Sequence, residues 1–575
     1  MDLSTLKKNL KKDLSGLTNV SVALLGDTPT QLLALAIKGY GVEDGYNVQL
    51  YEAEYNQIDQ EVLNISSDLY QAAPKFLIIF QSAEKLILDF YKLDKSNKAK
   101  FAESHIEKVS QYFETVNSNL KCNIIYLNFF ELNDNVYGNY ANKIDFSFTY
   151  QIRKINFELM NLAMQYKNLF ISDVCSLQNQ VGRNFSFTPT VYSETGMVFS
   201  LDFLPLIAKN SIDIIKSISG KIKKCIILDL DNTMWGGIIG DDGMEGIQIG
   251  NLGIGEIFTK FQYWIKQLKE RGIILAVCSK NEEDIAKEPF EKHPDMVIKM
   301  DDIAVFVANW NNKADNIKHI QNVLNIGFDS MVFIDDNPAE RKIVRDNVKD
   351  IVVPELPEDP AEYLIFLQSL NLFEVASVTE EDGDRTKQYQ EESKRMMMKK
   401  SFVNEDEFLQ SLSMTSICTS FEKIDIPRIA QLTQRSNQFN LRTARYTEED
   451  VVRIASSENH YSLSFKLNDT FGEYGLVSII VLEKKNKNDL FIDTWLMSCR
   501  VLKRGLEQQV LNEIVDIAKQ NGFNKIIGEY KPTNKNAMVK DHYLKLGFEP
   551  VSNEENNWEL DVNNYVYRQH FIKKI

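Results

Sequence analysis

Three apolar runs that each end in polar, reactive residues constrain this chain more than any other feature. They cover residues 225–228, 273–278 and 331–334. Two aspartates, Asp229 and Asp231, follow the first run. In an extended chain, side chains i and i+2 point the same way, so both carboxylates could face one site. One could act as a nucleophile or metal ligand while the other moves protons.

The remaining polar residues follow in an order that fits a single site. Ser279 follows the second run, Lys313 lies in the stretch WNNKADN, and Asp335 and Asp336 follow the third run. Helical stretches separate the runs, which predicts a parallel α/β sheet. Ligands of such sheets bind outside the carboxyl ends of the strands. The sequence therefore predicts one polar site at that edge of the sheet.

This set of motifs resembles the haloacid dehalogenase superfamily of Mg-dependent phosphotransferases. The resemblance implies that Asp229 is the nucleophile and Asp231 the general acid/base. It also implies that phosphate is bound by three further residues: Thr233, Ser279 and Lys313. The alternative is a fold that has kept these residues without activity.

The same resemblance implies a bound Mg²⁺, which takes hard oxygen ligands. Its carboxylate ligands would be Asp229, Asp231, Asp335 and Asp336. Without Mg²⁺ and the charge of Lys313, these carboxylates would repel a phosphate dianion. We therefore expect Mg²⁺ as the cofactor.

Composition limits the classes of function that remain. A length of 575 residues predicts about three domains. No apolar run reaches about 18 residues, so no membrane span is expected, and the first residues lack the apolar core of a signal peptide. The six cysteines have no metal or disulfide spacing, which favours a reducing cytoplasm. A net charge of −16 argues against nucleic-acid binding.

The first segment, residues 1–220, is predicted to be a parallel α/β domain. A strand and a Gly-Asp-Thr turn occupy 21–31, and this turn resembles the first block of SGNH-type esterases. The nucleophile position would be Thr28, and His105 is the only histidine in the segment. The late Asp-x-x-His block of that family is not evident, so we expect a domain that is not catalytic. Further strand candidates are 75–80, 122–129 and 169–174.

The second segment, residues 221–370, carries the phosphotransferase motifs. The gaps between its motifs are too short for a large cap domain. The glycines and short apolar runs of 234–250 predict a β-hairpin flap. A further cover for the site would have to come from flanking domains or a docked partner.

The third segment, residues 371–575, opens with a charged stretch at 380–402 that we expect to form a solvated connecting helix. The strands and helices that follow resemble the GNAT acyl-CoA transferase fold, which grips a pyrophosphate with a glycine-rich loop at a helix start. The corresponding loop runs from Arg500 to Gly505, and Lys503 stands in place of its first glycine. That replacement argues against acetyl-CoA binding.

All three segments together resemble the FkbH-like proteins, haloacid dehalogenase subfamily IIIC. The phrases that carry the resemblance are DLDNTMWGGIIGDDG, LAVCSKN, NNKADN, FIDDNPAER, RSNQFNLRTARY and NDTFGEYGLV. The resemblance implies Mg-dependent transfer of a glyceryl group from 1,3-bisphosphoglycerate to an acyl carrier protein, with dephosphorylation, in polyketide and related pathways. Two alternatives stay open: a phosphatase acting through an aspartyl-phosphate on a small or carrier-bound phosphoester, and a GNAT-type acyltransferase.

The acyl transfer needs a thiol, and Cys278 is the candidate for an acyl-thioester enzyme. It precedes Ser279, and Asn281 with the acidic residues after it predicts a helix start, which would lower a thiol's pKa. Strand alternation, however, points Cys278 and Ser279 to opposite faces. Both a nucleophile and a small apolar filler therefore remain possible.

A carrier partner would need a local basic patch, because the acidic chain repels acidic carriers. The candidates are Lys394, Arg395, Lys399 and Lys400, together with Lys503 and Arg504. A phosphopantetheine arm could also meet Asn437, Asn440, Arg442 and Arg500. For the asparagines and Arg442, loop and helix capping is an equally good alternative.

Overall fold

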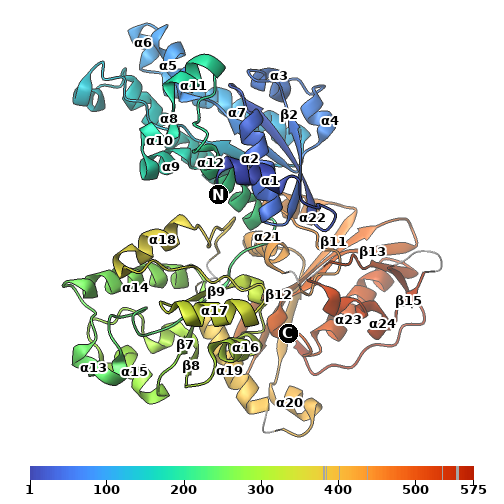
Figure 1. The fold of residues 1–575 in the computed structure, drawn as a ribbon. Coiled ribbons are helices and arrows are strands. Elements are labelled where there is room, and N and C mark those ends of the chain that lie inside the picture. Colours follow the sequence, from blue (N-terminus) through green and yellow to red (C-terminus); the bar gives the residue numbers. More distant parts are fainter. Residues whose placement is uncertain (380–382, 384, 400–401, 437, 534, 552–555) are drawn as a thin grey trace. The chain divides into compact units, whose positions relative to one another are not determined.

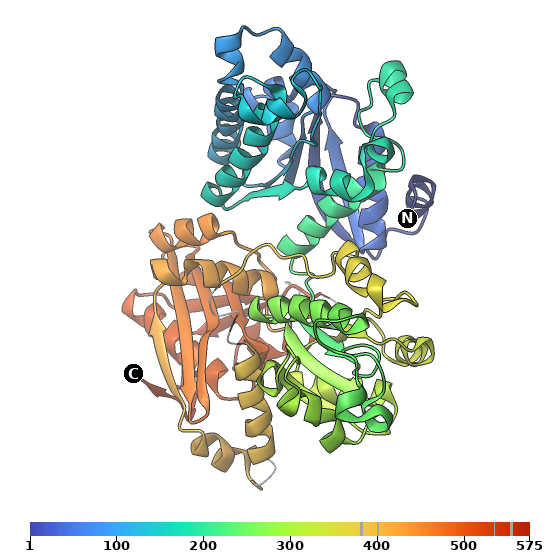
Figure 2. The same ribbon diagram turned by 90° about the vertical axis from the view of Figure 1, so that its left-hand side faces the viewer.

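The chain forms two compact units, Met1–Lys216 and Ser217–Ile575. The structure, a computed structural model, describes residues 1–379, 383, 385–399, 402–436, 438–533, 535–551 and 556–575. One sheet lies in the first unit and two lie in the second (Figures 1 and 2). The predicted α/β fold class is confirmed, and the predicted segments 221–370 and 371–575 share the second unit.

The first unit is built on a five-stranded parallel sheet in the order β2-β1-β3-β4-β5. Its strands are β1 (Thr18–Gly26), β2 (Tyr46–Glu52), β3 (Phe76–Phe80), β4 (Asn123–Leu127) and β5 (Leu169–Ser172). The sequence did not predict β2, because this edge strand buries only Tyr46 and Val48 fully and lacks a continuous apolar run.

Helices connect and cover these strands (Figure 1). In this unit they are α1 (Leu3–Asn9), α2 (Gln31–Glu43), α3 (Ile58–Leu63), α4 (Asp68–Ala72), α5 (Ala83–Tyr91), α6 (Lys95–Lys98), α7 (Phe101–Asn119), α8 (Phe148–Gln165), α9 (Val174–Val181), α10 (Arg183–Ser186), α11 (Pro189–Thr195) and α12 (Leu204–Ile218). The order of the strands places β1 between β2 and β3, so the chain leaves β1 first to one side and then to the other.

The second unit begins with a four-stranded parallel sheet in the order β8-β7-β6-β9. Its strands are β6 (Cys225–Leu228), β7 (Ile274–Ser279), β8 (Ile303–Ala308) and β9 (Met331–Ile334). Its helices are α13 (Ile239–Gly246), α14 (Ile254–Glu270), α15 (Glu283–Lys292), α16 (Lys313–Leu324), α17 (Pro338–Asn347) and α18 (Tyr363–Ser369). The three predicted strands are present, and β8 is added at the edge.

Two local predictions for this sheet are wrong. The expected β-hairpin flap is reduced to a single bridge between Gly236 and Gln248, and α13 fills the space between them. Helix α15 is capped at Glu282 rather than at Asn281. The Asn281 amide does not cap the helix and donates to the side chains of Asp231 and Ser279 instead.

The third sheet has eight strands in the order β15-β16-β14-β13-β12-β11-β10-β17. Most neighbours are antiparallel, but the pairs β13–β14 and β10–β17 run parallel. The strands are β10 (Thr415–Thr419), β11 (His460–Asp469), β12 (Gly472–Lys484), β13 (Asp489–Met497), β14 (Lys525–Glu529), β15 (Glu549–Pro550), β16 (Asn557–Asp561) and β17 (Lys573–Lys574). The helices are α20 (Glu405–Ser411), α21 (Ile426–Arg435), α22 (Glu448–Ser456), α23 (Leu506–Gln520) and α24 (His542–Lys545).

Helix α19 (Arg385–Lys399) is packed rather than solvated, which corrects the expectation for this stretch. It contacts β7 and β8 of the four-stranded sheet and β12 of the eight-stranded sheet. Gln390 donates to the Ile303 carbonyl at 3.0 Å. Arg395, 1% exposed, donates to both oxygens of Asp469 at 2.8 and 2.9 Å. A buried ion pair thus anchors α19 to the eight-stranded sheet.

Membrane insertion is a separate question. No helix in the described part of the chain combines the length and apolar character that a membrane span needs.

Replacing Arg395 by methionine should destabilise the second unit, because the Asp469 carboxylate would stay buried with less countercharge. We expect the free energy of unfolding to fall by roughly 3 kcal/mol, the low end for a broken buried pair, since Arg504 still reaches Asp469. Urea denaturation measures the change. The control is Lys399→Met, which breaks the exposed pair with Glu405 and should cost below about 1 kcal/mol. Equal losses in both variants would contradict an anchoring ion pair.

Candidate active site

Three carboxylates meet at the carboxyl edge of the four-stranded sheet. Strands β6 and β9 pair in parallel with Leu228 opposite Ile334, so the residues that follow them come side by side. Asp229 follows β6, and Asp335 and Asp336 follow β9; one oxygen from each lies within 4.8 Å of the other two. The sheet therefore brings together three of the four predicted carboxylates.

Lys313 supplies the positive charge of this group. Its Nζ lies 3.0 Å from Asp229 Oδ1 and 2.6 Å from Asp335 Oδ2. The lysine is the first residue of α16, which Asn312 caps by accepting from the Ala314 N–H at 2.8 Å. Burial disfavours the charged ammonium, but attraction to the two carboxylates outweighs burial and raises the pKa of Lys313. The lysine therefore stays protonated.

One lysine does not balance three carboxylates. Burial, followed by the charge of Asp229, raises the pKa of Asp335 and raises that of Asp336 to about 6. The uncompensated charge of the ionised group is two negative charges, which a divalent cation would neutralise. Its oxygen donors are also those that hard divalent cations take. The residues therefore fit a divalent metal ion.

The side chain of Asp231 lies outside this metal-binding group, which corrects the predicted ligand set. Its Oδ1 accepts from the Trp235 indole and the Ile239 N–H, both at 3.0 Å, and its Oδ2 accepts from Asn281 Nδ2 at 2.8 Å. These three donors come from the flap and from the turn after β7. Such a clamp fixes the direction of the carboxyl, which suits the predicted proton-transfer role better than metal binding.

The two predicted hydroxyl residues have different surroundings. Ser279 Oγ accepts from Asn281 Nδ2 at 3.3 Å, so the same amide holds Ser279 and Asp231. Thr233 Oγ1 accepts from the Asp336 N–H at 3.1 Å. Thr233 therefore fastens the turn after β6 to the turn after β9. Both hydroxyls are almost fully buried at the predicted phosphate side.

Several residues of the site were not predicted from the sequence. Arg341, 4% exposed, donates to the carbonyl oxygens of Asp335 and Asp336 at 2.8 and 2.7 Å. It thereby holds the turn that carries both acids. Asn281 and Trp235 orient Asp231 as described. All three lie inside the recognised phrases. Trp235 and Arg341 bond residues a few positions away, whereas Asn281 bonds Asp231 across 50 positions, a contact that only the fold assigns.

The structure buries Cys278, the predicted acyl nucleophile. Its side chain is fully buried in an apolar cluster with Cys225 and Ile227, and its Sγ lies 3.8 Å from the Lys313 carbonyl. Burial raises the pKa of the thiol, the opposite of what an attacking thiolate needs. Strand alternation also points Cys278 and Ser279 to opposite faces, so the surroundings of Cys278 favour the apolar-filler alternative.

The predicted anion loop of the third segment is engaged within the chain. Arg504 donates to Glu392 of α19 at 2.9 and 2.7 Å and to Asp469 at 3.3 Å. Arg500 bonds Gln388 of the same helix. Lys503 adopts the left-handed conformation, φ 61°, that the replaced glycine would favour. Lys503 is exposed whereas Arg504 is buried, so the loop does not offer an exposed arginine pair.

The other carrier-binding candidates are also largely internal. Asn440 is buried and accepts from the Thr443 N–H at 2.8 Å, so it caps a loop. Arg442 bonds Asp493 and Glu529, each at 2.5 Å. Arg395 is buried against Asp469, whereas Lys399 is exposed beside Glu405. Asn437, Lys400 and the Lys394 side chain lie outside the described residues. The predicted basic patch is therefore not formed by Arg395 and Arg504.

A parallel sheet with paired acids after β6 and β9, a buried lysine and a clamped second aspartate defines an enzyme of the haloacid dehalogenase type, in the phosphatase/transferase class. The model of the FkbH N-terminal domain family matches residues 21–216. The chain belongs to the FkbH-like family, as a solved relative shows. That relative, the N-terminal part of the protein BF1531 from Bacteroides fragilis, contains a phosphatase domain complexed with Mg. It is 53% identical, with 66% of this chain and 100% of that chain covered and a TM-score of 0.64.

Two further similarities concern N-acetyltransferases. The ribosomal-protein-S18-alanine N-acetyltransferase from Escherichia coli is 16% identical over 26% of this chain and 94% of that chain, with a TM-score of 0.20. The GNAT domain of S. lividans PAT is 16% identical over 25% of this chain and 89% of that chain, again with a TM-score of 0.20. Scores this low carry no argument about this chain. No curated protein matches it.

Replacing Asn281 by alanine should impair the orientation of Asp231, because the Oδ2 atom loses its side-chain donor. We expect kcat to fall roughly 10- to 100-fold with little change in KM. The loss should be smaller for an aryl phosphate, whose leaving oxygen needs less protonation than that of an alkyl phosphate. Steady-state kinetics on both substrates measures this. Asn347→Ala on the exposed side of α17 is the matched control, and an equal loss on both substrates would contradict the positioning role.

Proposed function

We propose that this chain is a Mg-dependent phosphatase and acyl transferase that accepts a phosphoryl group on Asp229. The observation that carries the proposal is the set of three carboxylates whose oxygens lie within 4.8 Å of one another beside a single buried lysine. The Mg in the structure of the relative from Bacteroides fragilis supports the same ion here. It would be held by Asp229, Asp335 and Asp336.

The chain's own residues divide the chemistry among them. Bound Mg²⁺ would neutralise the charge of the phosphate and polarise it. An oxygen of Asp229 attacks phosphorus, and the bond from phosphorus to the leaving oxygen breaks. Lys313 and Ser279 hold the non-bridging oxygens. Asp231 gives its proton to the leaving oxygen and then takes a proton from the water that hydrolyses the aspartyl-phosphate.

The substrate class follows from the family resemblance. The finer proposal is that the phosphate comes from an acyl phosphate such as 1,3-bisphosphoglycerate and that the glyceryl group passes to an acyl carrier protein. The attacking thiol would be that of the carrier's phosphopantetheine arm, since Cys278 is buried. Thiolate attack on the acyl carbon forms the thioester and expels phosphate, so no oxidant or further reactant is needed. The polyketide pathway and a reducing cytoplasm belong to the same proposal.

Two features support a substrate carried on a protein. The cap between β6 and α14 contains the short helix α13, and a small cap suits a substrate carried on a protein. The third segment keeps Lys503 exposed beside α23, where it could meet an acidic carrier. A GNAT-type acyltransferase is less well supported, because Arg504 is paired with Glu392.

Replacing Asp229 by asparagine should abolish phosphate release from a phosphoester, because the amide is a poor nucleophile. We expect a loss of at least about 10³-fold in kcat. Colorimetric phosphate release in the presence of Mg²⁺ measures it. The matched control is Asp241→Asn, an exposed acid on α13 that should retain wild-type activity. Retained phosphatase activity in Asp229→Asn would overturn the aspartyl-phosphate.

Glyceryl transfer is tested by intact-protein mass spectrometry. Wild type and Cys278→Ala would be incubated with Mg²⁺, 1,3-bisphosphoglycerate generated in situ and a phosphopantetheinylated carrier. We expect a glyceryl mass on the carrier with both proteins, because the buried thiol takes no part. A glyceryl adduct on the wild-type enzyme that the variant lacks would identify Cys278 as the acyl nucleophile. Phosphate release without any adduct would reduce the function to a phosphatase.

A further inference from the structure

Helix α8 of the first unit is apolar on two opposite faces (Figure 1). Its inner face packs on α7 and β5 and buries Ile152, Ile155 and Leu159. Its outer face exposes between 40% and 71% of four large apolar residues: Tyr150, Phe157, Met160 and Met164. The outer face of a surface helix is normally polar. Helix α7, all of whose residues the structure describes, follows that rule and exposes no large apolar residue.

The exposed residues of α8 have the spacing of a coiled-coil seam. Tyr150, Phe157 and Met164 are seven residues apart, and Arg153 and Met160 follow the first two of them by three residues. These are the a and d positions of a heptad, which lie on one stripe and face a partner helix. Together these five residues form the α8 stripe. Its residue types, aromatic residues, methionine and arginine, are those enriched at protein interfaces.

The surface beside the α8 stripe extends the apolar area. A 3₁₀ turn at Gly138–Lys143 contacts α8, and Arg153 Nη1 donates to Asn142 Oδ1 of this turn. Tyr137 and Tyr140 are exposed at the same turn. A stable interface buries about 800 Å² on each partner, more than one helix face supplies. The two tyrosines therefore bring the patch closer to the size that a stable contact needs.

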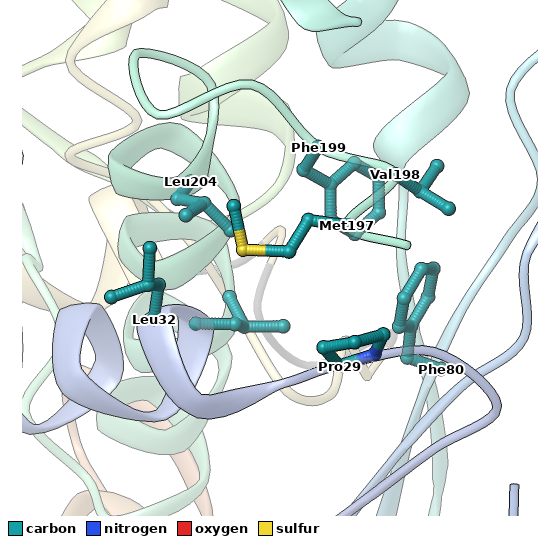
Figure 3. A pocket seen from close by; sticks show the side chains of 8 residues that line it. Pro29, Leu32, Phe80, Met197, Val198, Phe199 and Leu204 are labelled. Atoms are coloured by element: carbon teal, nitrogen blue, oxygen red, sulfur yellow. The ribbon is translucent and has the colours of Figure 1, made fainter. Parts of the chain in front are cut away.

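This patch is separate from the small apolar pocket at the carboxyl ends of β1 and β3 (Figure 3). That pocket is lined by apolar residues such as Pro29, Leu32 and Phe80, and none of its walls comes from α8. The α8 stripe, by contrast, lies open on the surface of the unit.

Charge allows the α8 stripe to meet a copy of itself. The chain carries a net charge of −16, so two copies repel each other at most of their surfaces. The stripe contains no acid, and its one charge, that of Arg153, is paired with Glu131 of the same unit at 2.6 Å. A second copy is therefore not repelled at this stripe.

Arg153 also decides the direction in which two copies would pair. In a parallel pair the two Arg153 side chains would lie opposite each other, and like charges that face each other across an interface are costly. In an antiparallel pair each a position lies opposite a d position. Arg153 then faces Met164 of the second copy, and Phe157 faces Met160 of the second copy. Methionine sulfur packs favourably on aromatic rings, so this register suits the residues present.

We propose that α8 pairs antiparallel with α8 of a second copy of this chain, giving a dimer with two-fold symmetry. Such a dimer uses the same patch on both copies and leaves no stripe uncovered. The two-fold axis passes between residues 158 and 159. The proposal is independent of phosphoryl transfer, because the stripe lies in the first unit and the active-site residues lie in the second.

Sedimentation-velocity ultracentrifugation of the full chain tests the dimer. We expect wild type to be dimeric at micromolar concentration, and Phe157→Glu to raise the Kd of the dimer at least about 100-fold, because its carboxylate would be buried without a partner. The matched control is Ile65→Glu between α3 and α4, where the replaced side chain is equally exposed, and this variant should stay dimeric. A monomeric wild type, or a Phe157→Glu variant as dimeric as wild type, overturns the proposal.

Cysteine cross-linking tests the direction without a disruptive charge. Phe157→Cys and Met160→Cys variants, mixed and oxidised, should form a disulfide between positions 157 and 160, identified by peptide mass spectrometry. Tyr150→Cys should not cross-link to itself, because an antiparallel pair holds its two copies roughly 25 Å apart. Wild type is the control for the native cysteines, of which Cys122, Cys225 and Cys278 are buried. Self-cross-linking of Tyr150→Cys, or no disulfide between positions 157 and 160, overturns the antiparallel pair.

Discussion

The contact of Lys313 with Asp229 and Asp335 is the interaction on which the active site depends. Two carboxylates that are almost fully buried could not stay ionised side by side without a countercharge. The ammonium, at 3.0 and 2.6 Å from them, supplies part of that charge. Asp336 leaves the group with an excess of negative charge, so the protein has built a site that is complete only with a divalent cation. Without such a cation, this excess of negative charge would repel a phosphate dianion.

Strand order explains where the sites of both parallel sheets lie. In each sheet the chain leaves a central strand first to one side and then to the other, which opens a crevice at the carboxyl edge. In the second unit the crevice between β6 and β9 holds acids and a lysine. In the first unit the crevice between β1 and β3 holds apolar side chains. One architectural rule therefore accounts for the position of the charged site in the second unit and of the apolar pocket in the first.

Two buried arginines of the third segment serve as structural ion pairs instead of binding an anionic ligand. Arg395 and Arg504 both reach Asp469, and Arg504 also pairs with Glu392 of α19. Guanidinium groups that could have gripped an anionic ligand instead join a helix to a sheet. Buried ion pairs of this kind are strongly destabilising to break, which suits them to fixing one arrangement. Lys503, by contrast, is exposed.

The sequence by itself determined the parallel α/β class, the strands that carry the motifs, and the identity of Asp229, Ser279, Lys313 and Asp335. Apolar runs and the residues at their ends are local features, which can be recognised in the sequence before the fold is known. Tertiary structure decided which neighbours each group meets. In the folded protein Cys278 is buried in the apolar core and Asp231 lies outside the group of metal-binding carboxylates. Arg395 and Arg504 pair with acidic residues of the same chain. Burial, distance and countercharge are properties of residues far apart in the chain, and only the folded protein sets them.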